Sequence, residues 1–227
     1  MLALPRTRHL PSGIQSLERP VTMERFLLAI SILLLVYLLG AVPFAYLITR
    51  ALNGADIRRL GSRNVGALNV YNSVGKGPGL LVFALDASKG LLAIYIVRWL
   101  GAPEVVMYLA AVSVAVGHNW SAFLSFGGGK GAATVFGVSL AVLPWITLGV
   151  LVFTVAAVYL TGYVVPSVTA GFMLLNILTL ASSQPGGQVF LCFFLTLLVA
   201  GAHFGRAALQ VLALARRGKW RDIAHLE

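Results

Sequence analysis

Charged side chains are scarce in this chain of 227 residues: Asp, Glu, Lys and Arg together make up 11% of it. A soluble globular domain carries about 25% charged residues, so the composition excludes an ordinary soluble globule. It also excludes a disordered chain, which needs low hydrophobicity, because 59% of the residues are apolar. The composition therefore predicts an all-α fold, a polytopic membrane helix bundle, in which the segments outside the lipid carry the chemistry.

Acidic residues and cysteine are scarcer still. Only 7 Asp and Glu stand against 17 Lys and Arg, and Cys192 is the 1 cysteine of the chain. A single cysteine permits no disulfide framework and no cysteine-rich metal site within the chain, and we expect neither a metal nor another cofactor. The net charge of +10 would suggest nucleic acid as the partner of a soluble protein. In a membrane protein, basic loops on the cytoplasmic side explain it better, and we expect no nucleic-acid partner.

Apolar runs of about 15–24 residues predict the membrane spans. The first run has no charged residue for 24 positions, which is too long for a signal-peptide core of about 7–15 residues, so we expect a retained helix. Residues 1–22 are expected to be a disordered extension, with Met23 as a candidate start, and 23–227 the membrane domain. Residues 131–162 could also form one long segment kinked at Pro144. About seven spans are expected, at 26–49, 79–100, 104–118, 131–144, 145–162, 166–182 and 188–206.

The basic residues indicate the sidedness of these spans. With seven spans, the loop 50–78, the loop 119–130 and the tail after residue 206 lie on one face, and they hold most of the Lys and Arg. The positive-inside rule makes this face cytoplasmic. Arg6, Arg8, Arg19 and Arg25 would then lie outside, a conflict that mostly disappears if the chain begins at Met23.

The loop 50–78 is rich in glycine, serine and asparagine. Glycines allow close approach of the backbone to a ligand, and consecutive amides in such turns form anion-binding sites. The loop is either a plain connection with turn residues or a phosphate-binding loop. Its candidate residues are Gly61, Ser62, Asn64, Gly66, Asn69 and Asn72.

The second polar loop joins His118 to a run of glycines around Lys130, and it leads directly into an apolar helix. Free amides and a partial positive charge at a helix N-terminus favour phosphate. The spacing does not match the nucleotide-binding loop with a Gly-Lys-Ser/Thr ending, because Gly131 follows Lys130. The alternative is a flexible loop with one orienting cation.

Two further polar pairs fall within or at the end of predicted spans. Asp86 and Lys89, at i and i+3, share a helix face and can form an ion pair. An ion pair inside a membrane either serves a function or holds helices together. His203 and Arg206 share a face at the end of the last span.

In this order, the motifs resemble those of the bacterial acyl-phosphate:glycerol-3-phosphate acyltransferase family (PlsY), and the resemblance covers nearly the whole chain from Met23. A G-S-x-N-x-G-A-x-N motif is matched by Gly61, Ser62, Asn64, Gly66, Ala67 and Asn69. An L-D-x-x-K-G motif is matched by Leu85, Asp86, Lys89 and Gly90. A glycine-rich motif is matched by Gly117, His118, Phe123, Leu124, Phe126, Gly128, Gly129, Lys130, Gly131, Ala133 and Thr134. Asn72 stands where the family has arginine, and Arg206 where it has asparagine.

The resemblance implies an enzyme that moves a fatty acyl group from acyl phosphate to the 1-hydroxyl of glycerol 3-phosphate. The product is lysophosphatidic acid, for phospholipid synthesis. It implies a multi-pass protein of the bacterial inner membrane whose active site faces the cytoplasm, in contact with membrane lipids. An enzyme that makes the acyl phosphate is expected as a transient partner.

The resemblance also implies roles for the polar residues. We expect Lys130 and the amides of Gly128, Gly129 and Gly131 to bind phosphate and stabilise developing charge. Ser62, with Asn64 and Asn69, would orient the acceptor, and His118 or His203 would assist proton transfer unless the phosphate of the donor does so. The Asp86–Lys89 pair would hold the second span against the loops. The other residues expected at the substrates are Gly61, Gly66, Thr134 and Arg206.

Two other functions fit part of the pattern. A transporter or channel for an anionic metabolite would explain the spans, the basic loops and the Asp86–Lys89 pair. A non-catalytic relative of the enzyme would explain the departures at Asn72 and Arg206.

Overall fold

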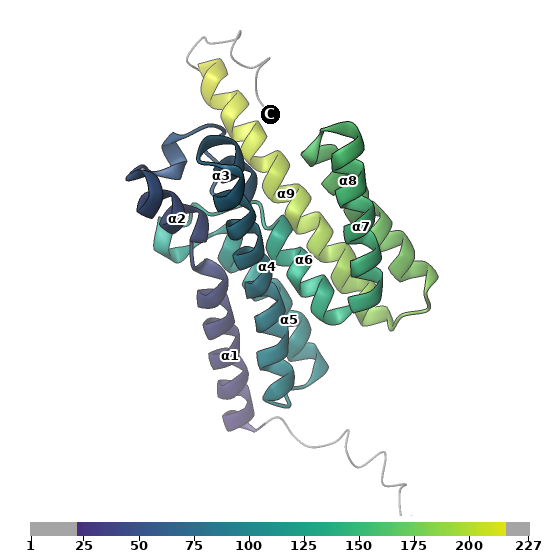
Figure 1. Ribbon diagram of the computed structural model, residues 1–227. Coiled ribbons are helices and arrows are strands. Elements are labelled where there is room, and N and C mark those ends of the chain that lie inside the picture. The colour runs from purple at the N-terminus through teal and green to yellow at the C-terminus, as the bar shows by residue number, and fades with distance from the viewer. Residues whose placement is uncertain (1–21, 217–227) are drawn as a thin grey trace, which may run out of the picture.

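The computed structural model describes residues 22–216, without the side chains of Arg206, Ala207, Leu209 and residues 210–216. This part of the chain contains helices and no strand (Figure 1), as the all-α prediction requires. The expected extension 1–22 lies outside the described residues except for Thr22, which caps the first helix. The elements are α1 (Met23–Ala41), α2 (Phe44–Asn53), η1 (Ile57–Arg59), α3 (Ala67–Ser73), α4 (Lys76–Trp99), α5 (Glu104–Asn119), η2 (Ala122–Leu124), α6 (Ala132–Val142), α7 (Pro144–Thr161), α8 (Val164–Ala181) and α9 (Gly186–Arg216).

Each of the seven predicted spans is helical, but they are not of equal length. Among the described residues, 6 stretches are long and apolar enough to cross a membrane. The segment expected at 131–144 is α6, which has 11 residues and at about 1.5 Å per residue is too short for a hydrocarbon core of about 30 Å. The expected break before Pro144 is confirmed, since α6 ends at Val142 and α7 begins at Pro144.

The first predicted span is not one continuous helix. A single helix was expected over 26–49, whereas α1 ends at Ala41 and α2 begins at Phe44. Pro43 causes the break, because proline lacks the N–H that continues the helical hydrogen bonds and its ring clashes with the preceding turn. The carbonyl of Pro43 then accepts the first hydrogen bond of α2, from the Leu47 amide at 3.0 Å.

Glycines let the helices that carry the loops pack backbone to backbone. A Cβ on Gly40 would overlap the carbonyl oxygen of Val114, which brings α1 against α5. A Cβ on Gly90 would overlap the carbonyl oxygen of Thr134, which brings α4 against α6. Small residues at such contacts are typical of membrane helices, where association depends on close van der Waals packing.

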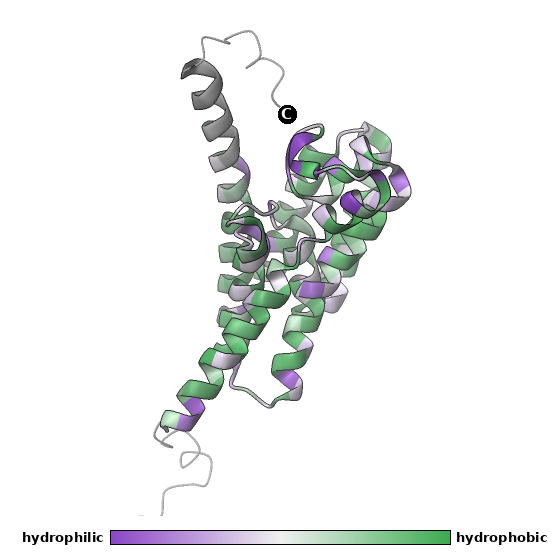
Figure 2. Ribbon diagram, turned by 90° about the vertical axis from the view of Figure 1, so that its left-hand side faces the viewer, coloured by the Kyte–Doolittle hydropathy of each residue, from purple (hydrophilic) through white to green (hydrophobic). Residues whose placement is uncertain are grey.

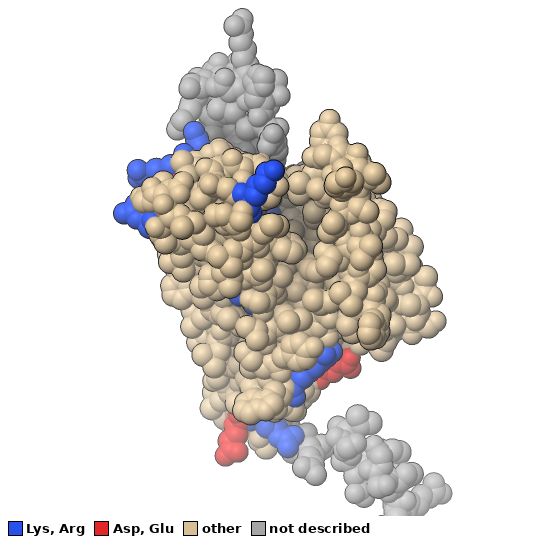
Figure 3. All heavy atoms as spheres, viewed as in Figure 1, with Lys and Arg blue, Asp and Glu red and all other residues tan. Residues whose placement is uncertain are grey.

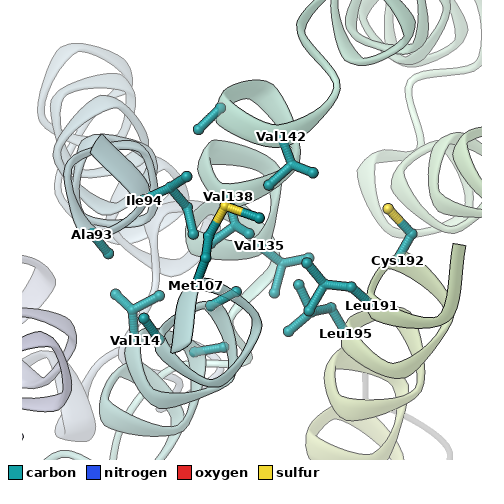
Figure 4. Close-up of a cluster of buried hydrophobic side chains, with 14 of the residues drawn as sticks. Ala93, Ile94, Met107, Val114, Val135, Val138, Val142, Leu191, Cys192 and Leu195 are labelled. Carbon is teal, nitrogen blue, oxygen red and sulfur yellow. The ribbon is translucent and has the colours of Figure 1, made fainter. Parts of the chain in front are cut away.

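A fully apolar core joins α4, α5, α6 and α9. Figure 4 shows side chains of these helices converging in one cluster, and they are buried. The cluster includes Ile94, Met107, Val114, Val135, Val138, Leu191 and Leu195. It provides a rigid support for the polar loops at one end of the bundle.

Polar and apolar residues separate along the long axis of the molecule. Hydrophobic residues line the helices, and hydrophilic residues gather at the end that carries α2 and α3 (Figure 2). Lys and Arg dominate the surface of that end, while both signs of charge occur at the opposite end (Figure 3). Large apolar side chains such as Leu35, Trp145 and Tyr159 are exposed on the helices, as expected for surfaces that face lipid.

Candidate active site

Asn69 organises the first polar loop. Its side chain is 3% exposed, and its Oδ1 accepts hydrogen bonds from the Ser62 amide at 3.2 Å and the Ser73 hydroxyl at 3.1 Å. Its Nδ2 donates to the carbonyl oxygens of Ile57 at 3.3 Å, Leu60 at 3.1 Å and Asn64 at 2.9 Å. The sequence led us to expect a direct substrate contact from Asn69. In the structure its polar atoms are occupied within the loop, so Asn69 has a structural role there.

Replacing Asn69 with aspartate should destabilise the loop. The carboxylate would turn a donor into an acceptor facing three carbonyl oxygens, and leaving such buried groups unsatisfied costs about 1–3 kcal/mol. We expect faster proteolysis of the loop and a lower melting temperature in detergent. Asn72→Asp is the matched control, since Asn72 is exposed on the same helix α3. Equal effects of the two changes would contradict this role for Asn69.

The glycines of the first loop permit this tight turn. Gly61 has φ +47°, and a Cβ on it would overlap Oδ1 of Asn69. Gly66 is the N-cap of α3 and lies against the Asn64 side chain. Ser62 and Arg63 are exposed at the tip of the loop.

The second polar loop is anchored to the end of α5. The Gly129 amide donates to the His118 carbonyl oxygen at 3.0 Å, and the Gly128 amide donates to that of Asn119 at 3.2 Å. Both amides were expected to bind phosphate, but they serve the loop itself because α5 ends there with unpaired carbonyl groups. The prediction is therefore corrected for Gly128 and Gly129.

The start of α6 keeps its capacity to bind an anion. Gly131 is its N-cap at φ +84°, no side chain caps the helix, and a Cβ on Gly131 would lie 2.5 Å from Oδ1 of Asn119. The first amides of a helix have no partner within the helix and carry a partial positive charge. Lys130, which is partly buried, precedes this end directly.

The two polar loops meet at Gly129. A Cβ on Gly129 would lie 2.6 Å from the carbonyl oxygen of Val65, and it would overlap Nε2 of His118. Lys130 also lies within electrostatic range of the half-buried His203 on α9. The structure thus brings both loops and the last helix to one end of the molecule, as the sequence predicted.

Asp86 and Lys89 form the predicted ion pair, and His118 joins it. Lys89 Nζ lies 2.8 Å from Oδ1 of Asp86 and 3.3 Å from Nδ1 of His118, and Nδ1 lies 3.6 Å from Oδ1 of Asp86. All three side chains are buried. The participation of His118 was not anticipated, because it comes from α5, 29 positions after Lys89.

One of the expected substrate residues, Thr134, does not reach the polar surface. Thr134 is 0% exposed on α6, and its backbone oxygen lies against Gly90 of α4, so a direct phosphate contact of its side chain is not supported. The side chain of Arg206 lies outside the described residues. Thr134 belongs to the helix contact that places the start of α6.

A small cavity lies below the meeting point of the loops. Residues 41–45, Asp86, His118, Gly128 and Gly129 contribute to its lining, and its volume is about 10 Å³. Ligand pockets typically measure about 300–1,000 Å³. We therefore expect phosphate-bearing ligands at the outer side of the loops, not in this cavity.

A wider hollow between α2 and η1 adds positive charge to the same end. Tyr46, Arg50 and Arg59 contribute to its lining. Arg58 donates to Asp56 from Nε at 3.0 Å and Nη2 at 2.7 Å, which holds the pKa of the Asp56 carboxyl below its ordinary value. Arg50 and Arg59 therefore supply the positive charge of this hollow, which favours the approach of anionic substrates.

Comparisons with known proteins identify relatives over most of the chain. A sequence model described as Glycerol-3-phosphate acyltransferase matches residues 30–209. A Glycerol-3-phosphate acyltransferase 1 of Deinococcus radiodurans is 41% identical over 177 residues, covering 78% of this chain and 89% of the relative. A Glycerol-3-phosphate acyltransferase of Thermus thermophilus is 37% identical over 175 residues, covering 77% of this chain and 87% of the relative.

Two crystal structures share the fold. Both are of PlsY (YgiH), described as an integral membrane glycerol 3-phosphate acyltransferase. The glycerol 3-phosphate form is 30% identical with a TM-score of 0.73, and the lysophosphatidic acid form is 28% identical with a TM-score of 0.71. Each match covers 83% of this chain and 93% of the other. The similarity confirms the prediction of a multi-pass membrane helix bundle.

Proposed function

Because the chain belongs to the glycerol-3-phosphate acyltransferase family, we propose that it is a membrane enzyme that acylates the 1-hydroxyl of glycerol 3-phosphate. The donor is a fatty acyl phosphate, and the products are lysophosphatidic acid and inorganic phosphate. The observation that carries this proposal is the meeting of the two glycine-rich loops at Gly129, beside Lys130 and the start of α6. Such a reaction needs two anion sites at a membrane surface, and this end of the bundle supplies basic and backbone donors for both.

The acyl phosphate is a mixed anhydride, so the carbonyl carbon is already activated. The hydroxyl oxygen of the acceptor bonds to this carbon, and the bond from the carbon to the phosphate oxygen then breaks. The hydroxyl proton passes to the leaving phosphate or to His203, which lies within electrostatic range of Lys130. Lys130 and the first amides of α6 stabilise the negative charge that develops on the intermediate and the leaving phosphate.

The first loop orients the acceptor. Ser62 is exposed at the loop tip, and its amide is held by Asn69. In this proposal the Ser62 hydroxyl and the Asn64 side chain hydrogen-bond glycerol 3-phosphate, while Asn69, Gly61 and Gly66 give the loop its shape. Arg63, also exposed there, supplies positive charge to this loop, whereas Asn72 stands where the family has arginine.

The basic end faces the cytoplasm in this proposal, and the protein lies in the inner membrane. The excess of Lys and Arg around α2, α3 and the start of α4 supports that orientation. The fatty chain of the donor lies in the bilayer, and its phosphate reaches the loops at the interface. In this proposal an enzyme that produces acyl phosphate is a transient partner that delivers its product to this face.

Purified protein should convert palmitoyl phosphate and glycerol 3-phosphate into lysophosphatidic acid, detected by mass spectrometry together with stoichiometric release of phosphate. A panel of other phosphorylated polyols tests the acceptor, which is relevant because Asn72 replaces the family arginine. Donor binding without turnover would favour a non-catalytic relative. Uptake of glycerol 3-phosphate into proteoliposomes in the absence of donor would favour a transporter.

A further inference from the structure

The proposed chemistry leaves one costly feature unexplained, an ammonium group buried in a membrane span. Lys89 is 1% exposed, and ions inside a membrane persist where they serve a function or complete a structure. Its Nζ donates to the carbonyl oxygen of Val42 at 2.9 Å and of Gly40 at 3.1 Å, besides the pair with Asp86. It also lies 5.2 Å from the centre of the Phe44 ring.

These contacts follow from the break in the first span. Pro43 ends α1, so the last carbonyl groups of that helix lose their partners within the helix. In lipid such groups must find donors inside the protein, and a cation is favoured at the negative end of a helix. Lys89 therefore attaches the end of α1 to α4, and Asp86 balances its charge.

His118 extends this attachment to the second loop. Its Nδ1 faces Lys89 and Asp86, and its Nε2 lies against the α-carbon of Gly129, where a Cβ would overlap it. Its backbone oxygen accepts the Gly129 amide at 3.0 Å. The imidazole therefore fills the space between the ion pair and the loop, with 8% of the residue exposed.

We propose that Asp86, Lys89 and His118 form a positioning cluster that sets the place of the loop 128–130, and with it Lys130, relative to the broken first span. His118 is then a positioning residue that acts through Gly129, and the proton-transfer role considered for it passes to His203 or the substrate phosphate. This inference rests on the proposed function for its catalytic consequence, but the placement of the loop can be measured without turnover.

The first test compares His118→Ala with His118→Gln. Alanine removes both contacts of the imidazole, and a small misplacement of catalytic groups typically costs about 10–100-fold in rate, so we expect kcat to fall by that factor. Glutamine has similar reach and can accept a hydrogen bond from Lys89, but it cannot titrate near neutral pH. It should restore kcat to within about fivefold of the wild type and leave the shape of the pH profile unchanged.

Hydrogen exchange of the Gly128 and Gly129 amides provides the readout that does not depend on turnover. Both amides donate to the end of α5, so they should exchange slowly in the wild type and in His118→Gln and faster in His118→Ala. Gly129→Ala is a second variant, in case the change at His118 impairs folding. Its methyl group would press on Nε2 of His118 and the Val65 carbonyl, and it should lower kcat by about 10–100-fold.

Each alternative result has a distinct meaning. If His118→Gln is as inactive as His118→Ala, or loses one limb of the pH profile, His118 takes part in proton transfer and the inference is wrong. Wild-type kcat in His118→Ala or Gly129→Ala would overturn it as well. If the wild type forms no lysophosphatidic acid, the proposed function fails, and unchanged amide exchange in His118→Ala would separately overturn the positioning role.

Discussion

Replacing Lys130 with alanine is expected to lower kcat/KM by about 10²–10³, the effect typical of losing one donor to an oxyanion. Lys130 lies between Gly129, where the two polar loops meet, and Gly131, which caps α6. No other described lysine occupies this position, because Lys76 is at the start of α4 and Lys89 is buried in it. Steady-state rates with acyl phosphate, on protein reconstituted at equal amounts, measure the loss.

The control for this change is the substitution of a second lysine, Lys76, at the same end of the molecule. Lys76 is exposed at the N-terminus of α4 and is not part of the proposed site. Lys76→Ala should keep kcat within about twofold of the wild type, since exposed charges are screened within about 8–10 Å at ordinary salt. If both variants lose activity equally, the effect of Lys130 is one of general surface charge and its assignment to the site is wrong.

The large features of the fold follow from the sequence because a membrane leaves few choices. Apolar runs must become helices there, and the runs before and after Pro144 do so as α6 and α7. The same reasoning put the two polar loops at one end, where they meet at Gly129. Asp86 and Lys89 could also be paired from their spacing alone, because i and i+3 lie on one face of a helix.

The contacts that complete the site could not be predicted, because they join positions far apart in the sequence. Lys89 meets the carbonyl oxygen of Gly40 across 49 positions. Pro43 within an apolar run was a signal that α1 breaks there, but it does not indicate which donor satisfies the freed carbonyl groups. The amides of Gly128 and Gly129 were assigned to phosphate because the pattern of glycines does not reveal that α5 ends beside them.

Gly90→Ala tests whether the contact between α4 and α6 determines the place of the site. In a helix interior, alanine is normally more stable than glycine by about 1 kcal/mol. At Gly90 the added methyl would overlap the backbone oxygen of Thr134, which a change of rotamer cannot relieve, so the helices must separate. We expect the variant to be less stable by about 1–3 kcal/mol, measured as unfolding in mixed micelles.

The same substitution at Gly149 should have the opposite sign. Gly149 lies within α7, and a methyl group added there would meet no neighbouring atom of another element within 4 Å. Gly149→Ala therefore gains helix propensity without a clash and should be more stable by about 1 kcal/mol.

Because Thr134 lies three positions after Gly131, separation of α4 and α6 in Gly90→Ala also moves the N-terminus of α6 away from the loops. Gly90→Ala should therefore lose activity even at temperatures where it is folded, whereas Gly149→Ala should not. If Gly90→Ala were as stable and active as Gly149→Ala, close packing of α4 on α6 would have no part in holding Lys130 at the site.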